Sequence, residues 1–212
     1  LNVLGAVALL VQRGQTPLSP GFKTLAQVAL NAPIMWEIDG GLFGSHSGVR
    51  AWVRQLDRAA KDPSVAGVFL RVNSPGGTIG ASQELYEAVK RVRAANKKIV
   101  VSVADLCASG AYYASAPADR IIANPGSLVG SIGVILSSPE LTGLMEKVGV
   151  RVNVVKSAPS KDILSPYRAM SEAERAGLQG LIDTMYGQFL DAVLTWRTNR
   201  GKSDAASVLR AH

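Results

Sequence analysis

The chain has 212 residues, of which 47% are hydrophobic and 18% charged, a balance that excludes a disordered tail and allows a sizeable core. Its single cysteine, Cys107, excludes an internal disulfide framework and any metal site built from several cysteines. The only histidines are His46 and His212, so a site with several histidines is excluded and a Ser-His-Asp triad would have to use His46.

The net charge of +7, from 23 basic and 16 acidic residues, permits contact with nucleic acid or an anionic membrane but requires neither. The densest basic cluster lies at the end of a predicted helix and has no aromatic residue between its charges; it comprises Lys90, Arg91, Arg93, Lys97 and Lys98. This pattern favours a solvated helix end that complements the helix dipole. We expect no nucleic-acid partner, no cofactor and no metal.

The N-terminal segment is apolar from Leu1 to Val11 apart from Asn2, and the chain begins with Leu rather than Met. Eleven residues cannot span a bilayer, which takes about 20 in a helix. The segment is therefore either the remnant of a longer membrane anchor or an ordinary buried helix or strand. Residues 17–20 read as a linker, so we divide the chain into an N-terminal segment, 1–31, and a folded domain, 32–212.

Hydrophobic periodicity predicts alternating strands and helices over the folded domain. The predicted strands are residues 32–39, 66–72, 99–103, 120–123, 131–136 and 150–155. The predicted helices are residues 49–60, 81–95, 109–116, 139–148 and 171 to about 196, the last opened by a capping box of Ser171 and Glu174. This repeated βαβ order predicts an α/β fold with a mainly parallel sheet flanked by helices.

Two loops follow predicted buried strands, where parallel α/β folds place their sites. In the first, residues 73–77, the consecutive glycines Gly76 and Gly77 let backbone N–H groups approach a ligand, either a phosphate or an oxyanion. A plain turn explains the same residues. In the second, Ser109 stands between Ala108 and Gly110 at the start of a predicted helix, either as a nucleophile or merely as an N-cap.

A serine nucleophile needs a base, and the candidates are few. His46 lies in a Gly-Ser-rich loop without an obvious carboxylate partner, and Cys107, with no basic neighbour in sequence, reads as a packing residue. A lysine base must lose its charge near neutral pH, which requires a partly apolar loop. Lys156 and Lys161 both lie in such a loop, and the residues alone do not choose between them.

Four motifs, in order and with compatible spacing over residues 32–196, resemble the bacterial signal peptide peptidase A family. They are Val72-Asn73-Ser74-Pro75-Gly76-Gly77, Ala108-Ser109-Gly110-Ala111-Tyr112-Tyr113, Gly130-Ser131-Ile132-Gly133-Val134 and Lys161-Asp162-Ile163-Leu164-Ser165-Pro166. The resemblance implies a serine protease with a Ser-Lys dyad on a fold like those of Clp protease and crotonase.

Carried over by motif, the resemblance implies that Ser109 is the nucleophile and Lys161 the general base, with Ser131 orienting the lysine. Gly76, Gly77 and the N–H of Gly110 would form the oxyanion hole. It further implies homo-oligomers whose sites can be shared between subunits. The catalytic domain would be anchored to the bacterial membrane, outside the cytoplasm, and would cut signal peptide remnants through an acyl-enzyme.

The chain departs from the family pattern at Ala111, where glycine is common, and at its end. The family's final glycine-rich turn and Gly-Leu-Val-Asp-like stretch do not appear before His212, so we expect the catalytic domain, 32–212, to be truncated at its C-terminus. Two other functions fit the glycine turn: a crotonase-type acyl-CoA enzyme, which would leave Ser109 and Lys161 unexplained, and a non-catalytic scaffold of the same fold.

Overall fold

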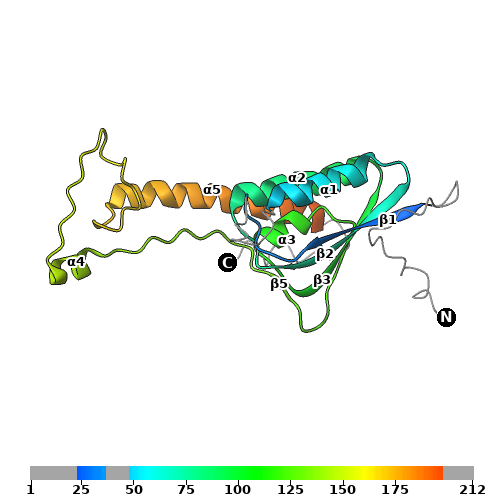
Figure 1. Ribbon diagram of the computed structural model, residues 1–212, viewed down its shortest axis with the longest axis horizontal. Helices are drawn as coiled ribbons and strands as arrows, with labels where there is room; N and C mark the ends of the chain where they lie inside the picture. Colours follow the sequence, from blue (N-terminus) through cyan, green and yellow to red (C-terminus); the bar gives the residue numbers. More distant parts are fainter. Residues whose placement is uncertain (1–22, 37–47, 198–212) are drawn as a thin grey trace, which may run out of the picture. The chain divides into compact units, whose positions relative to one another are not determined.

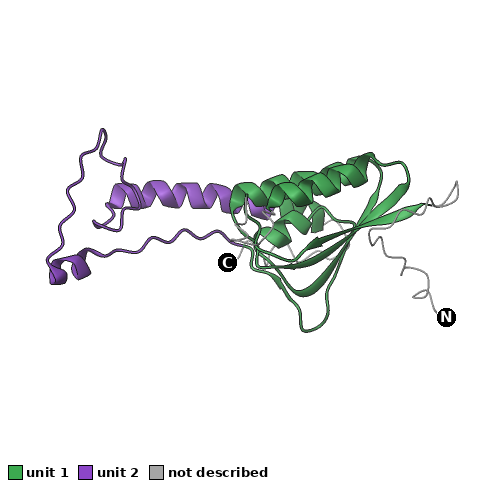
Figure 2. Ribbon diagram, viewed as in Figure 1, with its two compact units in different colours: residues 1–132, 192–212 green, residues 133–191 purple. Residues whose placement is uncertain are grey.

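The computed structural model describes residues 23–36 and 48–197 and divides the chain into two compact units. Unit 1 comprises residues 1–132 and 192–212, and unit 2 comprises residues 133–191 (Figure 2). The predicted boundary after residue 31 does not coincide with a boundary between the two units, and it stays a prediction. The N-terminal apolar segment, His46 and His212 lie outside the described residues.

A parallel sheet of five strands forms the centre of unit 1. Its strands are β1 (Thr24–Leu30), β2 (Val65–Ser74), β3 (Lys98–Ala108), β4 (Arg120–Ile122) and β5 (Leu128–Gly130). They lie in the order β1-β2-β3-β4, and β5 pairs with the carboxyl end of β3, beyond β4. Every pairing is parallel, as the βαβ pattern predicted.

Three helices of unit 1 cover one face of this sheet (Figure 1): α1 (Val49–Lys61), α2 (Ile79–Ala94) and α3 (Gly110–Ser115). Alternate residues of the central strands point into the core beneath them, and Leu70 and Val101 are fully buried with Leu56 of α1 and Leu85 of α2. Full burial of each such side chain contributes about 1.5–3 kcal/mol to stability. The predicted α/β class, with a sheet flanked by helices, is confirmed.

The N-terminal strand prediction is wrong in position. Residues 32–36 form only an isolated bridge, between Ile34 and Gly77, and the regular strand is β1, earlier in the chain. At the edge of the sheet β1 buries only Val28 and Leu30, and its other residues are exposed or only partly buried. Such a short half-buried run carries a weak hydrophobic signal, which is why the periodicity pointed to the neighbouring segment.

The strands predicted over residues 131–136 and 150–155 are also wrong, because both segments lack regular structure. The nearest strand is β5, which ends at Gly130, one residue before the first of these segments. Ile135 is 93% exposed and Val155 is 100% exposed, so their β-branched side chains have no sheet to pack on. Residue preference for strands depends on a partner strand, and the described part of unit 2 contains none.

Unit 2 contains α4 (Thr142–Val148) and most of the long helix α5 (Glu172–Arg197), whose last residues belong to unit 1. The predicted capping box at the start of α5 is confirmed: the N–H of Ser171 donates to Glu174 Oε2 at 3.0 Å, and the N–H of Glu174 donates to Ser171 Oγ at 3.3 Å. In the described ranges, no helix is both long and apolar enough to cross a bilayer.

Candidate active site

Ser109 occupies a sharp turn between β3 and α3. Its backbone angles are φ 50° and ψ −125°, in a region that residues other than glycine rarely adopt. Holding a side-chain-bearing residue there costs about 1–3 kcal/mol, and such strain gathers at functional sites. Ser109 is only partly buried at this strand-to-helix turn, and a nucleophilic serine on a strained turn of this kind is a recurrent arrangement in hydrolases.

The hydroxyl of Ser109 does not cap the helix that follows it. Although Ser109 stands at the N-cap position of α3, its side chain makes no capping hydrogen bond. The competing interpretation of Ser109 as an ordinary N-cap is therefore wrong. Among the described residues its hydroxyl has no assigned partner and the residue is half-buried, as a nucleophile that meets a substrate must be.

The glycine turn after β2 packs directly against Ser109. A Cβ atom built on Gly76, which has φ +93°, would lie 2.5 Å from the nitrogen of Gly110 and 3.0 Å from the Cβ of Ser109. A Cβ atom built on Gly110 would lie 2.1 Å from Ser82 Oγ and 3.3 Å from the nitrogen of Gly77. Glycine is thus required sterically at both positions, and the two loops meet backbone to backbone as their place after neighbouring strands predicted.

Two backbone N–H groups at this meeting point remain without a protein acceptor. Within residues 23–36 and 48–197, the N–H groups of Gly77 and Gly110 donate to no protein group, whereas the N–H of Gly76 donates to Ser74 Oγ at 3.2 Å. Gly110 also begins α3, where the first N–H groups of a helix are free. Adjacent free N–H groups beside a serine are the donors that an oxyanion requires.

Ser131 emerges next to Ser109. Ala108 of β3 pairs with Gly130 of β5 in parallel register, so the residues that follow them leave the sheet side by side. The N–H of Ser109 donates to the carbonyl of Gly130 at 2.8 Å. Ser131 also has a positive φ, of 52°. The structure therefore brings five of the six predicted site residues together at one edge of the sheet: Gly76, Gly77, Ser109, Gly110 and Ser131.

The sixth residue, Lys161, lies in unit 2, in a run of turns that precedes α5. The side chain of Lys161 is exposed, and no hydrogen bond or ion pair is assigned to it within the described chain. The other loop lysine differs: Lys156 Nζ donates to Asp162 Oδ1 at 2.7 Å and to the carbonyl of Pro159 at 2.7 Å. Lys156 is thus engaged by a carboxylate, whereas Lys161 has no side-chain partner in the described chain. The exposure of Lys161 differs from the partly apolar surroundings expected for a lysine base, so its role stays a prediction.

Two buried serines that support the site were not among the predicted site residues. Ser74 Oγ donates to the carbonyl of Ala32 at 2.7 Å and accepts the Gly76 N–H, which holds the glycine turn against the segment after β1. Ser82 Oγ donates to the carbonyl of Thr78 at 2.8 Å and lies beside the Cα of Gly110. Both are small polar residues inside apolar elements, a signal too common to single them out.

A polar contact also shapes the end of β3. The register of β2 and β3 shifts between Val72 and Ser74, so that β3 carries extra residues before Cys107. The side chain of Asn73 accepts the N–H of Leu106 at 3.1 Å in this bulge. Bulges next to active sites redirect the residues that follow, and this one precedes Ser109 by three residues.

Cys107 is a packing residue, as predicted. It is fully buried, and burial raises the pKa of its thiol to about 11. A thiol with so high a pKa is almost entirely protonated near neutral pH and makes a poor nucleophile.

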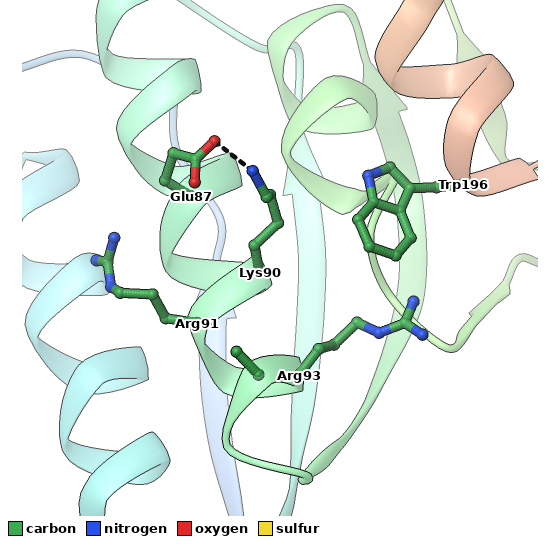
Figure 3. A pocket seen from close by; sticks show the side chains of 6 residues that line it. Glu87, Lys90, Arg91, Arg93 and Trp196 are labelled. Atoms are coloured by element: carbon green, nitrogen blue, oxygen red, sulfur yellow. Dashed lines mark hydrogen bonds and ion pairs between the residues drawn. The ribbon is translucent and has the colours of Figure 1, made fainter.

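The basic cluster at the end of α2 is engaged within the protein. Arg91 pairs with Asp57 at 2.8 Å, Lys90 pairs with Glu87 at 2.8 Å, and Arg93 stacks on the ring of Trp196 at 4.7 Å. A pocket at this helix end (Figure 3) includes none of the predicted site residues; it is lined by Glu87, Lys90, Arg91, Arg93, Ala94 and Trp196. Among the described residues no group of three or more metal-ligating side chains occurs.

At the carboxyl edge of the parallel sheet, a strained serine lies beside two N–H groups, and neither its hydroxyl nor these groups has a partner in the described part of the chain. This is the arrangement of a serine hydrolase of Clp protease-like fold. The sequence profile of the Clp protease family matches residues 46–129, and that of peptidase family S49 matches residues 91–207. The chain belongs to peptidase family S49.

Individual relatives agree with this assignment. The chain is 40% identical over 202 residues to the "Putative protease" of Methanocaldococcus jannaschii, covering 93% of the chain and 65% of the relative. It is 34% identical over 176 residues to the "Putative signal peptide peptidase SppA" of Enterococcus faecium, covering 82% and 51%. It is 35% identical over 179 residues to "Protease 4" of Salmonella typhi, covering 84% and 28%. The chain thus spans less than two thirds of each of these relatives.

Proposed function

We propose that this protein is a serine endopeptidase in which Ser109 attacks a peptide carbonyl and Lys161 accepts the serine proton. The observation that carries the proposal is the strained turn at Ser109, which packs against the glycine turn and whose hydroxyl has no partner within residues 23–36 and 48–197. Membership of peptidase family S49 supports peptide hydrolysis as the reaction.

The proposed mechanism proceeds through an acyl-enzyme. Neutral Lys161 removes the proton from Ser109 Oγ as the oxygen bonds to the carbonyl carbon, and the resulting oxyanion receives hydrogen bonds from the N–H groups of Gly77 and Gly110. Lysine then returns the proton to the leaving amine, and water hydrolyses the ester by the same route. Gly76 shapes the oxyanion loop, and Ser131 hydrogen-bonds and orients the lysine.

We propose remnant signal peptides as the substrates and a bacterial membrane as the place of action, with the catalytic domain outside the cytoplasm. The name of the Enterococcus faecium relative supports the substrate class. The four motifs that resemble the signal peptide peptidase A family support both the substrate and the location.

We also propose a homo-oligomer whose sites can combine residues of neighbouring subunits. Unit 2 supports this, because large apolar side chains on its extended segments are exposed, among them Ile135, Val150, Val152, Val154 and Val155. A monomeric soluble protein rarely exposes so many, and a second copy would bury them.

Two lysine variants and one serine variant test the dyad. We expect Ser109→Ala and Lys161→Ala each to abolish hydrolysis of a fluorogenic peptide and labelling by a fluorophosphonate. Lys156→Ala should keep measurable hydrolysis and labelling, because Lys156 is not the proposed base. Labelling at a residue other than Ser109, or activity that survives Lys161→Ala and is lost in Lys156→Ala, would contradict the assignment.

Mixing the two inactive chains tests the shared site. If Ser109→Ala and Lys161→Ala subunits recover activity when refolded together, the serine and the lysine come from different subunits. If no mixture recovers activity although mass measurement shows mixed oligomers, each subunit completes its own site.

A further inference from the structure

The loop that carries Lys161 is held by a compact group of four charges within unit 2. Arg168 lies at its centre: Nη2 donates to Asp162 Oδ1 at 2.7 Å and Nε donates to Asp162 Oδ2 at 3.0 Å. The same guanidinium donates to Glu174 from Nη1 at 2.8 Å and from Nη2 at 2.6 Å. Lys156 completes the group through its 2.7 Å contact with Asp162.

This charge group links two places that the proposed chemistry needs fixed. Asp162 is the immediate neighbour of Lys161, and Glu174 belongs to the capping box at the start of α5. Arg168 therefore ties the loop of the proposed base to a rigid helix end. Turns within the loop add to this, since the Ile163 N–H donates to the carbonyl of Ser160 at 3.2 Å.

The geometry of Arg168 suits a rigid link better than a lysine would. A planar guanidinium forms paired hydrogen bonds with each of two carboxylates, whereas an ammonium is a point charge on a flexible stem. The carboxylates are well shielded, because the side chain of Asp162 is 15% exposed and that of Glu174 is 5% exposed. Arg168 holds the pKa of Asp162 well below its usual range and that of Glu174 at about 2, so both remain charged at neutral pH.

The charge group also balances the carboxylate beside Lys161. Asp162 and Glu174 are matched by Arg168 and Lys156, so the four groups have no net charge. The carboxylate that follows Lys161 in the sequence is therefore engaged by two cations within the group.

We infer that Arg168 is a positioning residue for Lys161, acting through its paired hydrogen bonds to Asp162 and Glu174. The inference rests on the proposed dyad and adds a residue to it that does not touch the substrate. Loss of Arg168 releases the loop and leaves Asp162 with Lys156 alone. Misplacing a reacting group by about 1 Å costs roughly a hundredfold in rate.

The test compares Arg168→Ala and Arg168→Lys in the full chain with a matched control, Arg175→Ala. Arg175 follows Glu174 in the first turn of α5. It is exposed, and its side chain has no partner in the described chain. We expect Arg168→Ala to lower kcat and the rate of Ser109 labelling by fluorophosphonate roughly a hundredfold, with KM changed less than about threefold. Arg168→Lys should recover only part of the rate, and Arg175→Ala should match the unmodified protein.

Three results bear on the inference separately from the proposed function. If Arg168→Ala keeps its labelling rate while Lys161→Ala loses it, the dyad stands and the positioning role is refuted. If Arg168→Ala loses activity only in proportion to the unfolded fraction, measured by circular dichroism at the assay temperature, a purely structural role replaces it. If Lys161→Ala itself labels normally, the proposed dyad is refuted and the inference about Arg168 is refuted with it. Arg168→Ala is then expected to label normally too.

Discussion

Gly76 offers the sharpest test of the proposed oxyanion loop, because its environment leaves no room for a side chain. A Cβ atom at this position would lie 2.5 Å from the Gly110 nitrogen and 2.8 Å from the carbonyl oxygen of Ala108, both backbone atoms. Real Cβ atoms are essentially never closer than 3.0 Å, so Gly76→Ala must push the two loops apart. The displaced group includes the N–H of Gly110, one of the two proposed oxyanion donors.

Two effects of Gly76→Ala can be estimated separately. Its φ of +93° disfavours any residue with a side chain, which costs about 1–2 kcal/mol of folding stability, and relief of the contacts adds to this. Loss of one oxyanion donor costs about a hundredfold to a thousandfold in kcat. We therefore expect a folded but destabilised protein with kcat reduced at least a hundredfold and KM little changed.

The control for this variant is Gly80→Ala, four residues further along the chain. A Cβ atom at Gly80 meets nothing within 4 Å, and the residue lies in the first turn of α2, where alanine is favoured by up to about 1 kcal/mol. Peptide hydrolysis by both variants should be measured well below their unfolding temperatures. Wild-type kcat in folded Gly76→Ala would refute the oxyanion role of this turn.

Two further predictions concern titrating groups away from the proposed dyad. Because burial raises the pKa of Cys107 to about 11, only about one thiol in a thousand is ionised at pH 8. Iodoacetamide should therefore modify Cys107 only after unfolding. Rapid alkylation of the native protein, detected by mass spectrometry, would contradict its burial. Arg168, and then the N–H of Ser171, lowers the pKa of Glu174 from its ordinary value near 4.5 to about 2. A depressed native pKa stabilises the fold above the ordinary value and ceases to do so as pH falls toward 2, so the urea midpoint should fall over that range, and less steeply in Glu174→Gln.

Several features of the fold followed from local sequence patterns. The helix α1 was predicted within one residue, because its apolar residues recur at helical spacing and Asp62 and Pro63 end it. The capping box at Ser171 was predicted from two residues three positions apart. Features of this kind depend on residues within one or two turns of each other.

The wrong strand predictions failed because strands depend on residues that are distant in the sequence. Residues 150–155 alternate as a strand would, yet they pair with nothing in the described chain, and β1 forms although its own pattern is weak. A strand exists only where a second strand accepts its hydrogen bonds, and that partner is distant in sequence. Periodicity alone therefore could not place these two segments.

The same distinction between local and distant residues applies to the candidate site. Local sequence was enough to show which residue types stand after each strand: two consecutive glycines, a serine among small residues, and lysines in a later loop. The strained backbone of Ser109 could be seen only in the fold, because its φ reflects the packing of β3, α3 and the glycine turn against one another. The same holds for its hydroxyl, which has no partner among the described residues. Likewise, only folding distinguished Lys156, which is paired with Asp162, from Lys161, since an ion pair depends on where the chain brings two charges together.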